Sequence, residues 1–357
     1  MRLDLKSINQ CVRCGSCRTF CPVLEESGWE SANARGRIMI LKGLTCGLSP
    51  DSKVLESLNT CTTCGICTEN CPAGINPPQM IESARRELVS MGVMTRQQED
   101  LSRIIYASGN TFGETRDRLS WFSSDRSTTP KSADYVYFVG CMNSYRYPET
   151  AARTYSLLHR FKATLLPREV CCGSPLMRIG YNASRFVDEN CRQISEIGAS
   201  TVITGCAGCY TTLKNSYPKD FRVLSVPEFL AEHISELDLK KLDLTVTYHD
   251  PCHLGRHNRI FEQPRQVIEA ICSLMEMKTN REAARCCGGG GGVRAGYRDL
   301  SLQMARRRLE DASDEVDYIV TSCPLCIRNL SDAGAGERVI DLVDLVTMAL
   351  NDPKNAD

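Results

Sequence analysis

The strongest constraint in the sequence is a pair of adjacent cysteines, Cys286-Cys287, followed by five consecutive glycines at residues 288–292. The same Cys-Cys-Gly triplet stands earlier, at Cys171-Cys172-Gly173. Two adjacent thiolates can direct both sulfurs at one small object. Glycines let the backbone approach that object closely and turn N–H groups toward negative charge. An iron–sulfur cluster is such an object, because thiolates hold it and hydrogen bonds to its sulfurs help set its potential.

Length and composition limit the class of protein. The 357 residues suffice for two or three domains, and 43 acidic against 43 basic residues give no reason to expect nucleic acid as a partner. The 21 cysteines lie in tight clusters, as metal ligands do. No signal-peptide apolar stretch follows Met1 and no run of 18 apolar residues occurs. We therefore expect a cytoplasmic metalloprotein without a membrane span, which reaches a membrane only through a partner.

The N-terminal region contains the motif C-x2-C-x2-C-x3-C-P twice, beginning at Cys11 and at Cys61. This is the two-cluster ferredoxin spacing, in which the fourth cysteine of each run ligates the other cluster. A pair of structural zinc sites is the alternative, and two identical runs with a closing proline argue against it. The motif predicts two [4Fe–4S] cubanes, one held by Cys11, Cys14, Cys17 and Cys71 and the other by Cys61, Cys64, Cys67 and Cys21.

After the second run the pattern changes in two stages. Residues 107–133 are rich in Ser, Thr, Gly and Asp and lack a core-forming period, which is typical of a linker or an exposed segment. From Asp134, short apolar runs such as 135–139 alternate with helical stretches, the pattern of parallel α/β units. The sequence predicts a helical two-cluster ferredoxin module at 1–106, a linker at 107–133, and two Rossmann-like α/β domains at 134–240 and 241–357.

The second α/β half repeats the cysteine order of the first. Corresponding cysteines are offset by 111, 115 and 117 residues, which indicates an internal duplication with pseudo-twofold symmetry. Each half offers five cysteines at the carboxyl ends of expected strands, where open α/β sheets bind ligands. The first five-cysteine set is Cys141, Cys171, Cys172, Cys206 and Cys209, and the second five-cysteine set is Cys252, Cys286, Cys287, Cys323 and Cys326.

Other roles for these sets fit less well. A vicinal disulfide would leave three converging thiolates without a function, and zinc takes four ligands and gains nothing from a glycine run. A phosphate loop needs Lys and Ser or Thr after the glycines, whereas Val293-Arg294 follow here. Cys46, Cys191 and Cys272 lie outside both sets, and we interpret them as ordinary cysteines.

Two copies of C-x(n)-C-C-G-x(n)-C-x-x-C behind a ferredoxin module resemble the cysteine-rich CCG-domain family. From Cys11 to Cys326 the arrangement resembles the D-type subunit of heterodisulfide reductases, which is equivalent to their B and C subunits fused. The resemblance implies that each five-cysteine set holds a noncubane [4Fe–4S] cluster, so that its cysteines are both metal ligands and catalytic residues. In that family the disulfide CoM-S-S-CoB is cleaved between the two clusters, each of which takes up one sulfur, and the cubanes supply the electrons.

Three histidines surround Cys252, at His249, His253 and His257. Splitting a disulfide to two thiols requires two protons, and histidine titrates near neutral pH. We expect His249 and His253 to be catalytic residues that relay these protons. The alternative is that they only hydrogen-bond the backbone or a cluster sulfur.

Three arginines near the second set are candidates for binding an anionic substrate: Arg256, Arg285 and Arg294. Arginine suits the tetrahedral anions that CoM and CoB carry. The same side chains can instead balance the charge of a cluster, and the sequence does not separate the two roles.

Two main functions compete. The first is a disulfide reductase subunit that acts on the heterodisulfide or a related thiol pair. The second is an electron-transfer subunit of a flavin-dependent glycolate, lactate or glycerol-3-phosphate dehydrogenase, whose iron–sulfur subunits resemble this chain, and a subunit of an aromatic acyl-CoA-reducing complex is a third. Two complete five-cysteine sets favour the first. The chain has no dinucleotide fingerprint, so we expect a flavin-containing or cytochrome b subunit as electron donor.

Overall fold

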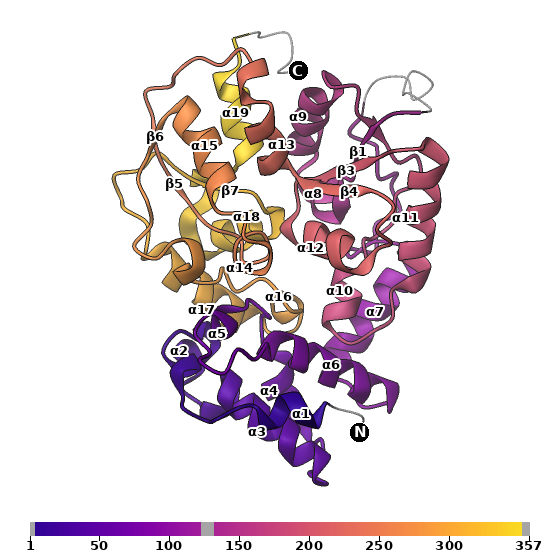
Figure 1. Cartoon of the computed structure of the whole chain (residues 1–357), viewed down its shortest axis with the longest axis vertical. Helices are drawn as coiled ribbons and strands as arrows, with labels where there is room; N and C mark the ends of the chain where they lie inside the picture. The colour runs from indigo at the N-terminus through magenta and orange to yellow at the C-terminus, as the bar shows by residue number, and fades with distance from the viewer. Residues whose placement is uncertain (1–3, 123–131, 352–357) are drawn as a thin grey trace.

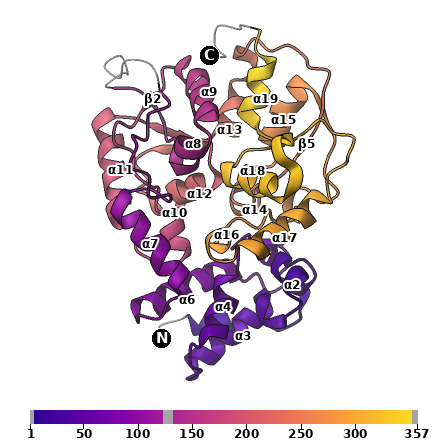
Figure 2. The same ribbon diagram turned by 180° about the vertical axis from the view of Figure 1, so that it is seen from behind.

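The computed structural model describes residues 4–122 and 132–351 as a helical N-terminal module below two α/β domains (Figure 1). In Figure 1 the module is indigo to purple, the first domain lies to the right and the second, orange to yellow, to the left; Figure 2 gives the view from behind. The expected order of a helical region and two parallel-sheet domains is confirmed. The domain boundaries and the comparison with Rossmann-like units stay predictions.

The N-terminal module packs its helices around a small apolar core. This core includes Ile38 and Leu41 of the third helix, Leu58 of the fourth and Leu88 of the sixth. Side chains begin several helices, as when Asp51 accepts the N–H of Val54. The helices are α1 (Leu5–Asn9), α2 (Pro22–Ser27), α3 (Ala34–Thr45), α4 (Ser52–Asn59), α5 (Ile66–Glu69), α6 (Pro77–Ser90) and α7 (Arg96–Ser108).

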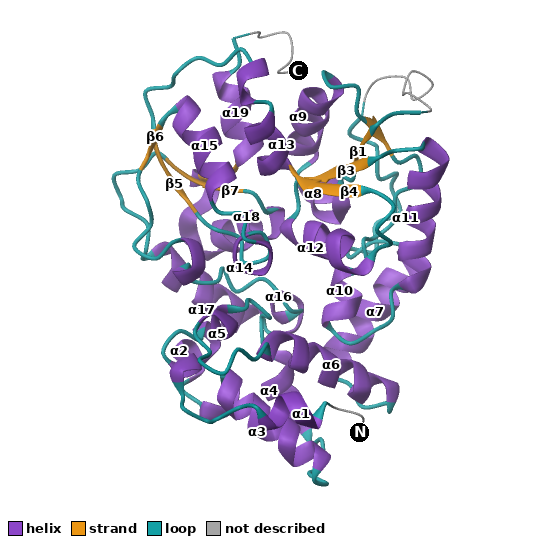
Figure 3. Cartoon of the chain, viewed as in Figure 1, coloured by secondary structure: helices purple, strands orange, loops and turns teal. Residues whose placement is uncertain are grey.

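The first domain is a four-stranded parallel sheet of order β2-β1-β3-β4 with helices on both faces (Figure 3). Alternate residues of its central strand enter different apolar clusters, Val136 on one face and Tyr137 on the other, so both faces are buried. Its strands are β1 (Tyr135–Tyr137), β2 (Thr164–Leu165), β3 (Thr201–Thr204) and β4 (Arg222–Ser225). Its helices are α8 (Gly140–Arg146), α9 (Pro148–His159), α10 (Ser174–Arg178), α11 (Ser184–Ile197), α12 (Ala207–Ser216) and α13 (Val226–Glu232).

The second domain repeats this topology in the order β6-β5-β7-β8. Its last strand ends at Asp341, whose side chain accepts the N–H of Val343 and so begins a helix there. Its strands are β5 (Thr245–Tyr248), β6 (Ser273–Leu274), β7 (Tyr318–Thr321) and β8 (Val339–Asp341). Its helices are α14 (Gly255–Asn258), α15 (Glu262–Ile271), α16 (Val293–Gly296), α17 (Arg298–Leu309), α18 (Pro324–Leu330) and α19 (Leu342–Ala349).

The two domains share one apolar core. Helices α9 and α13 of the first domain face α15 and α19 of the second at the top of Figures 1 and 2. Phe229, Ile268 and Val346 belong to the same buried cluster, and Arg153 donates to Asp344 across the boundary at 2.8 Å. This core fixes the two domains relative to each other, and with them the two cysteine sets.

The glycine run at 288–292 lies against the backbone of the N-terminal module. A Cβ atom on Gly290 would lie 2.8 Å from the carbonyl oxygen of Thr62, and one on Gly291 would overlap the carbonyl oxygen of Cys61. Gly291 also has φ +64°, a conformation that other residues rarely adopt. Close backbone packing therefore requires glycine at these two positions.

The first and last glycines of the run make different contacts. The N–H of Gly288 lies 3.3 Å from the Sγ of Cys286, so one backbone donor does point at a sulfur, as the sequence suggests. A Cβ on Gly292 would lie 2.7 Å from Ile179 in the first domain. The run thus touches all three parts of the molecule.

The buried Arg85 of α6 ties the same three parts together. Its guanidinium donates to the carbonyl oxygens of Leu58 and Cys61 in the module, of Arg178 in the first domain at 2.7 Å, and of Gly291 in the second at 3.0 Å. A planar fork with five N–H donors can satisfy four carbonyls at once, which a lysine cannot do.

We expect Gly291→Ala to destabilise the contact between the module and the second domain. The added Cβ meets Cys61, and overpacking of this kind typically costs about 1–3 kcal/mol beyond the cost of positive φ. Gly92→Ala is the matched control, since Gly92 has φ +77° and no atom within 4 Å of an added Cβ. Anaerobic denaturant unfolding and limited proteolysis measure both variants, and equal losses of stability would contradict the packing argument.

Candidate functional site

Each five-cysteine set lies at the carboxyl ends of three neighbouring parallel strands. Because β1 lies between β2 and β3, and β5 between β6 and β7, the loops that follow them converge. In the first domain β1 leads to Cys141, β2 to Cys171 and Cys172, and β3 to Cys206 and Cys209. In the second domain β5 leads to Cys252, β6 to Cys286 and Cys287, and β7 to Cys323 and Cys326.

The thiols of the first set touch one another in a chain. Contacts join Cys141 to Cys171, Cys171 to Cys172, Cys172 to Cys209, and Cys209 to Cys206. Four of the five are buried, and Cys206 is half-buried. The contact with Cys171 and then burial raise the pKa of Cys141, whereas hydrogen bonds from Cys171 and Cys209 lower that of Cys172. Five crowded sulfurs of this kind fit a multinuclear cluster.

The second set repeats the chain of contacts. Cys252 touches Cys286, Cys286 touches Cys287, and the Sγ atoms of Cys287 and Cys326 lie 3.3 Å apart. Cys326 in turn touches Cys323. All ten thiols of the two sets are free, and five per site exceeds the four that zinc takes.

Two further thiol contacts cross between parts of the molecule. Cys206 of the first domain touches Cys323 of the second. Cys64 of the module touches Cys286 of the second domain. The second set is therefore in contact both with the module and with the first set.

The eight cysteines of the module lie close together, and Cys67 of the second predicted group also lines the hollow of the first group. Cys71 lines the same small hollow as Cys11, Cys14 and Cys17, although it stands in the other sequence run. Burial raises the pKa of Cys21, with Cys64 and Cys61 as neighbouring thiols that add to it. Cys14 is exposed, whereas Cys61 and Cys64 are buried, so the first group lies nearer the surface.

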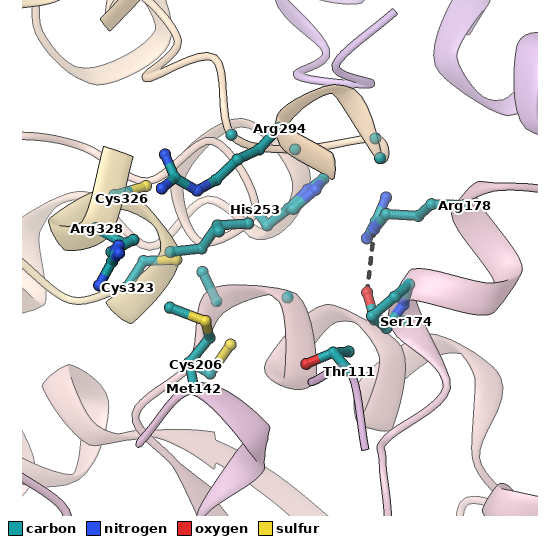
Figure 4. A pocket seen from close by; sticks show the side chains of 18 of the residues that line it. Thr111, Met142, Ser174, Arg178, Cys206, His253, Arg294, Cys323, Cys326 and Arg328 are labelled. Atoms are coloured by element: carbon teal, nitrogen blue, oxygen red, sulfur yellow. Dashed lines mark hydrogen bonds between the residues drawn. The ribbon is translucent and has the colours of Figure 1, made fainter. Parts of the chain in front are cut away.

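A cavity of about 390 Å³ lies between the two sets (Figure 4). Cys206 reaches it from the first domain, and Cys252, Cys287, Cys323 and Cys326 reach it from the second. Among the described residues that line it, none is acidic and four are arginines: Arg146, Arg178, Arg294 and Arg328. A small anionic molecule would meet sulfurs from both domains there.

The three histidines near Cys252 occupy different environments. His253 lines the cavity and is buried, and neither of its ring nitrogens has a hydrogen-bond partner among the residues that the structure describes. Burial lowers its pKa well below the usual value, and Arg178 adds to this. His257 lies with its Nε2 2.9 Å from the carbonyl oxygen of Thr63, and burial lowers its pKa to about 4.

His249 lies outside the cavity lining and faces the second set instead. Its Nδ1 accepts the Nε–H of the buried Arg308 at 2.9 Å, which leaves the proton of the neutral ring on Nε2. The ring lies within 4.8 Å of Cys287 and Cys326, with a contact to the Cys287 thiol. Its Nε2 makes no hydrogen bond to any described residue, yet the ring lies beside these sulfurs and not in the cavity, which fits the alternative role better than proton relay.

The three arginines near the second set in sequence also lie in different environments. Arg294 lines the cavity and pairs with Asp332. Arg285 pairs with Asp311 at 2.7 Å and with Glu25, and it does not line the cavity. Arg256 is buried outside the cavity lining and donates to the carbonyl of Cys64 at 2.8 Å.

Sequence reasoning missed the contribution of the segment after α7. Arg118, within the stretch interpreted as a linker, is buried against the first set with its Nη2 3.4 Å from the Sγ of Cys141. Its Nη1 donates to Glu169 at 2.9 Å. Thr111 and Phe112 from the same segment line the cavity. No spacing links these residues to a motif, so only their positions in the fold reveal them.

Arg118 and Glu169 form a buried ion pair. Burial raises the pKa of Glu169 to about 7, and Arg118 opposes this shift. The groups that touch its carboxyl oxygens are donors, namely Arg118 and the N–H groups of Val139 and Gly140. An ionised carboxylate is the state that these contacts require.

Among the helices in the described parts of the chain, none is long and apolar enough to cross a membrane.

Comparison with known proteins agrees with the site. A cysteine-rich domain matches twice, at residues 135–214 and 246–331, and a 4Fe-4S dicluster domain matches at 7–75. The fold and site thus define an iron–sulfur oxidoreductase in which a dicluster module serves two cysteine-rich domains. The D subunit of the dihydromethanophenazine:CoB–CoM heterodisulfide reductase of Methanosarcina acetivorans is 35% identical over 98% of this chain and 95% of its own length. The chain belongs to the family of these heterodisulfide reductase D subunits.

More distant relatives match only part of their own length. The B subunit of the fumarate reductase (CoM/CoB) of Methanothermobacter marburgensis is 34% identical over 60% of this chain and 46% of its own. The EtfAB:quinone oxidoreductase of Syntrophomonas wolfei is 30% identical over 62% of this chain and 35% of its own.

We expect Arg118→Met to lower the midpoint temperature of unfolding strongly, because it leaves Glu169 buried without its cation. Breaking a buried pair on one side typically costs about 3–5 kcal/mol. The double variant Arg118→Met/Glu169→Leu should lower the midpoint temperature less than Arg118→Met does. Arg103→Met removes an ion pair of an exposed side chain and should lower the midpoint temperature only slightly. Differential scanning calorimetry of the cluster-loaded protein compares them. If Arg118→Met and Arg103→Met lowered the midpoint temperature equally, the buried pair would contribute no more to stability than an exposed one.

Proposed function

We propose that the protein reduces a small-molecule disulfide in the cavity between the two five-cysteine sets, with the CoB–CoM heterodisulfide named for its relatives as the substrate. The observation that carries this proposal is the contact of Cys206 with Cys323 on the wall of that cavity. One thiol comes from each domain, so a disulfide in the cavity has one sulfur beside each set. Family membership over 98% of the chain supports the same reaction.

The cluster content follows from the cysteine groups. We infer that Cys11, Cys14, Cys17 and Cys71 hold one cubane and that Cys61, Cys64, Cys67 and Cys21 hold the other. All four cysteines of the first group line one hollow, which Cys67 of the second group also reaches. Each five-cysteine set holds a noncubane [4Fe–4S] cluster, and its five touching thiols are its ligands. The fifth thiol, beyond the four of a cubane, supports this difference.

The reaction balances as R–S–S–R′ plus two electrons and two protons, giving R–SH and R′–SH. Bound clusters supply single electrons and iron sites with affinity for thiolate. The chain holds the substrate in the cavity beside Cys206 and Cys323, and its arginines offset negative charge there. Of the two histidines expected to relay protons, His253 reaches the cavity and is the proton carrier in this proposal, whereas His249 lies beside the sulfurs of Cys287 and Cys326 and outside the cavity lining.

The partner must be a one-electron donor. A flavin-containing or cytochrome b subunit fits, since the module presents its exposed Cys14 at the surface and the chain has no dinucleotide motif of its own. A location at the cytoplasmic face of a membrane through such a partner is part of the proposal.

The alternative function is an electron-transfer subunit without chemistry of its own. The likeness to the EtfAB:quinone oxidoreductase favours it, as does the resemblance to iron–sulfur subunits of flavin dehydrogenases. A conduit does not need a cavity with sulfurs from both domains, and this is the feature that separates the two functions.

We expect about sixteen irons per chain and a new paramagnetic signal when a thiol such as CoM-SH is added. Cys171→Ala/Cys172→Ala should abolish turnover and leave the cubane signals intact, because both thiols contact other cysteines of the first set. Cys191→Ala, outside both sets, is the control. Iron and sulfide quantitation with EPR tests this. About eight irons, or no response to any thiol, would support the electron-conduit function instead.

We expect Arg294→Gln to raise KM for an anionic disulfide with little change in kcat, because the arginine lines the cavity and supplies no sulfur or proton to the reaction. Arg285→Gln, outside the cavity lining, is the matched control and should leave KM unchanged. Steady-state assays with anionic and neutral disulfides measure the effect. An equal loss for both disulfides would rule out a role for Arg294 in charge recognition.

A further inference from the structure

Arg256 occupies the junction between the module and the second five-cysteine set. It lies in α14 and is 5% exposed. Its Nε–H donates to the carbonyl of Cys64 at 2.8 Å, and its Nη1 donates to the carbonyls of Glu282 and Ala284, just before Cys286. One guanidinium therefore holds together the two backbone segments that bring Cys64 and Cys286 into contact.

The charge of Arg256 has no carboxylate partner among the described residues. Its hydrogen bonds to the backbone all go to carbonyl oxygens, and its buried Nη2 has no partner. The groups near it that can carry negative charge are the thiols of Cys64, Cys252 and Cys286, while His253, His257 and the Asp311-paired Arg308 also lie near it. A buried cation without a counter-ion is strongly unfavourable unless negative charge lies close by, and sulfurs that are deprotonated as ligands supply it.

The first five-cysteine set also has a buried arginine, but its charge is neutralised. Arg118 lies 3.4 Å from the Sγ of Cys141 and pairs with Glu169 at 2.9 Å. Glu169 is itself buried and accepts from Val139 and Gly140. The two sets thus have equivalent cysteines and different electrostatic surroundings, a bare cation at the second and a neutral pair at the first.

We propose that Arg256 makes the cluster of the second five-cysteine set the more easily reduced of the two, so that an electron arriving from the Cys61–Cys64 side of the module is held there first. A reduced cluster carries one more negative charge, and a nearby cation in a low-dielectric interior stabilises that charge. The electron comes from a one-electron donor protein, so that one cluster of the module is oxidised by one electron as the second-set cluster is reduced by one. The inference rests on the cluster assignment of the proposed function.

The experiment is an EPR-monitored redox titration of the cluster-loaded full chain, with dithionite as reductant. Signals are first assigned to the two sets with the Cys171→Ala/Cys172→Ala and Cys286→Ala/Cys287→Ala variants. In Arg256→Gln we expect the reduced-to-oxidised ratio of the second-set signal at fixed potential to fall at least tenfold, which is about 59 mV for a one-electron couple. Arg256→Lys keeps the charge and should recover most of this loss.

The first set provides the matched test. Glu169→Gln removes the carboxylate that neutralises Arg118, so the midpoint potential of the first-set signal should rise while that of the second set stays unchanged. This variant keeps the inference testable if Arg256→Gln fails to retain its second-set cluster. Iron content is measured for every variant alongside the titration.

Three outcomes would overturn different claims. Wild-type protein with about eight irons and no signal from either five-cysteine set would overturn the cluster assignment, and this inference with it. Full iron content with unmoved potentials in Arg256→Gln and Glu169→Gln would overturn the inference alone and leave the proposed function standing. An equal fall in the reduced-to-oxidised ratio of the second-set signal in Arg256→Gln and Arg256→Lys would show that Arg256 holds the backbone in place. That result would contradict its role in setting the potential.

Discussion

The structure depends on one close approach, that of the glycine run at 288–292 to the backbone of Cys61 and Thr62. Only glycine leaves room for those carbonyls, and Arg85 holds the contact by donating to both sides of it. The approach brings Cys64 beside Cys286, and so brings the module into contact with the second five-cysteine set. Without this approach the chain would contain the same cysteines, but the sulfurs of the module would not contact those of the second five-cysteine set.

Duplication gave the two α/β domains the same topology, but their surroundings make them different. The second set touches the module through Cys286 and the first set through Cys323, whereas the first set depends on Arg118 from the segment before its domain. The cavity lies between them, with sulfurs from both sides and arginines but no acids among its described lining residues. Electrons from the module and a disulfide in the cavity can therefore meet at the second set without crossing the first.

Much of this was predictable from the sequence, because ligand spacing is a local property. Cys71 lies with Cys11, and the Cys-Cys pairs follow corresponding strands, as the motifs and their offsets imply. The cavity was not predictable, since Arg178 and Arg328 reach it from helices that only the packing of the domains brings together. The same applies to Arg118, which no spacing connects with Cys141. Arg285 and Arg256 stand near the second set in sequence, as Arg294 does, yet of these three only Arg294 faces the cavity.

The central claim is that a disulfide is reduced between two metal-bearing sets of five cysteines. Anomalous diffraction at the iron edge from anaerobic crystals of the loaded protein, soaked with the heterodisulfide, tests it most directly. The account predicts iron at both five-cysteine sets, separate from the iron of the module, and substrate sulfur in the cavity beside Cys206 and Cys323. Iron at only one set, or substrate bound elsewhere with both sets filled, would contradict it.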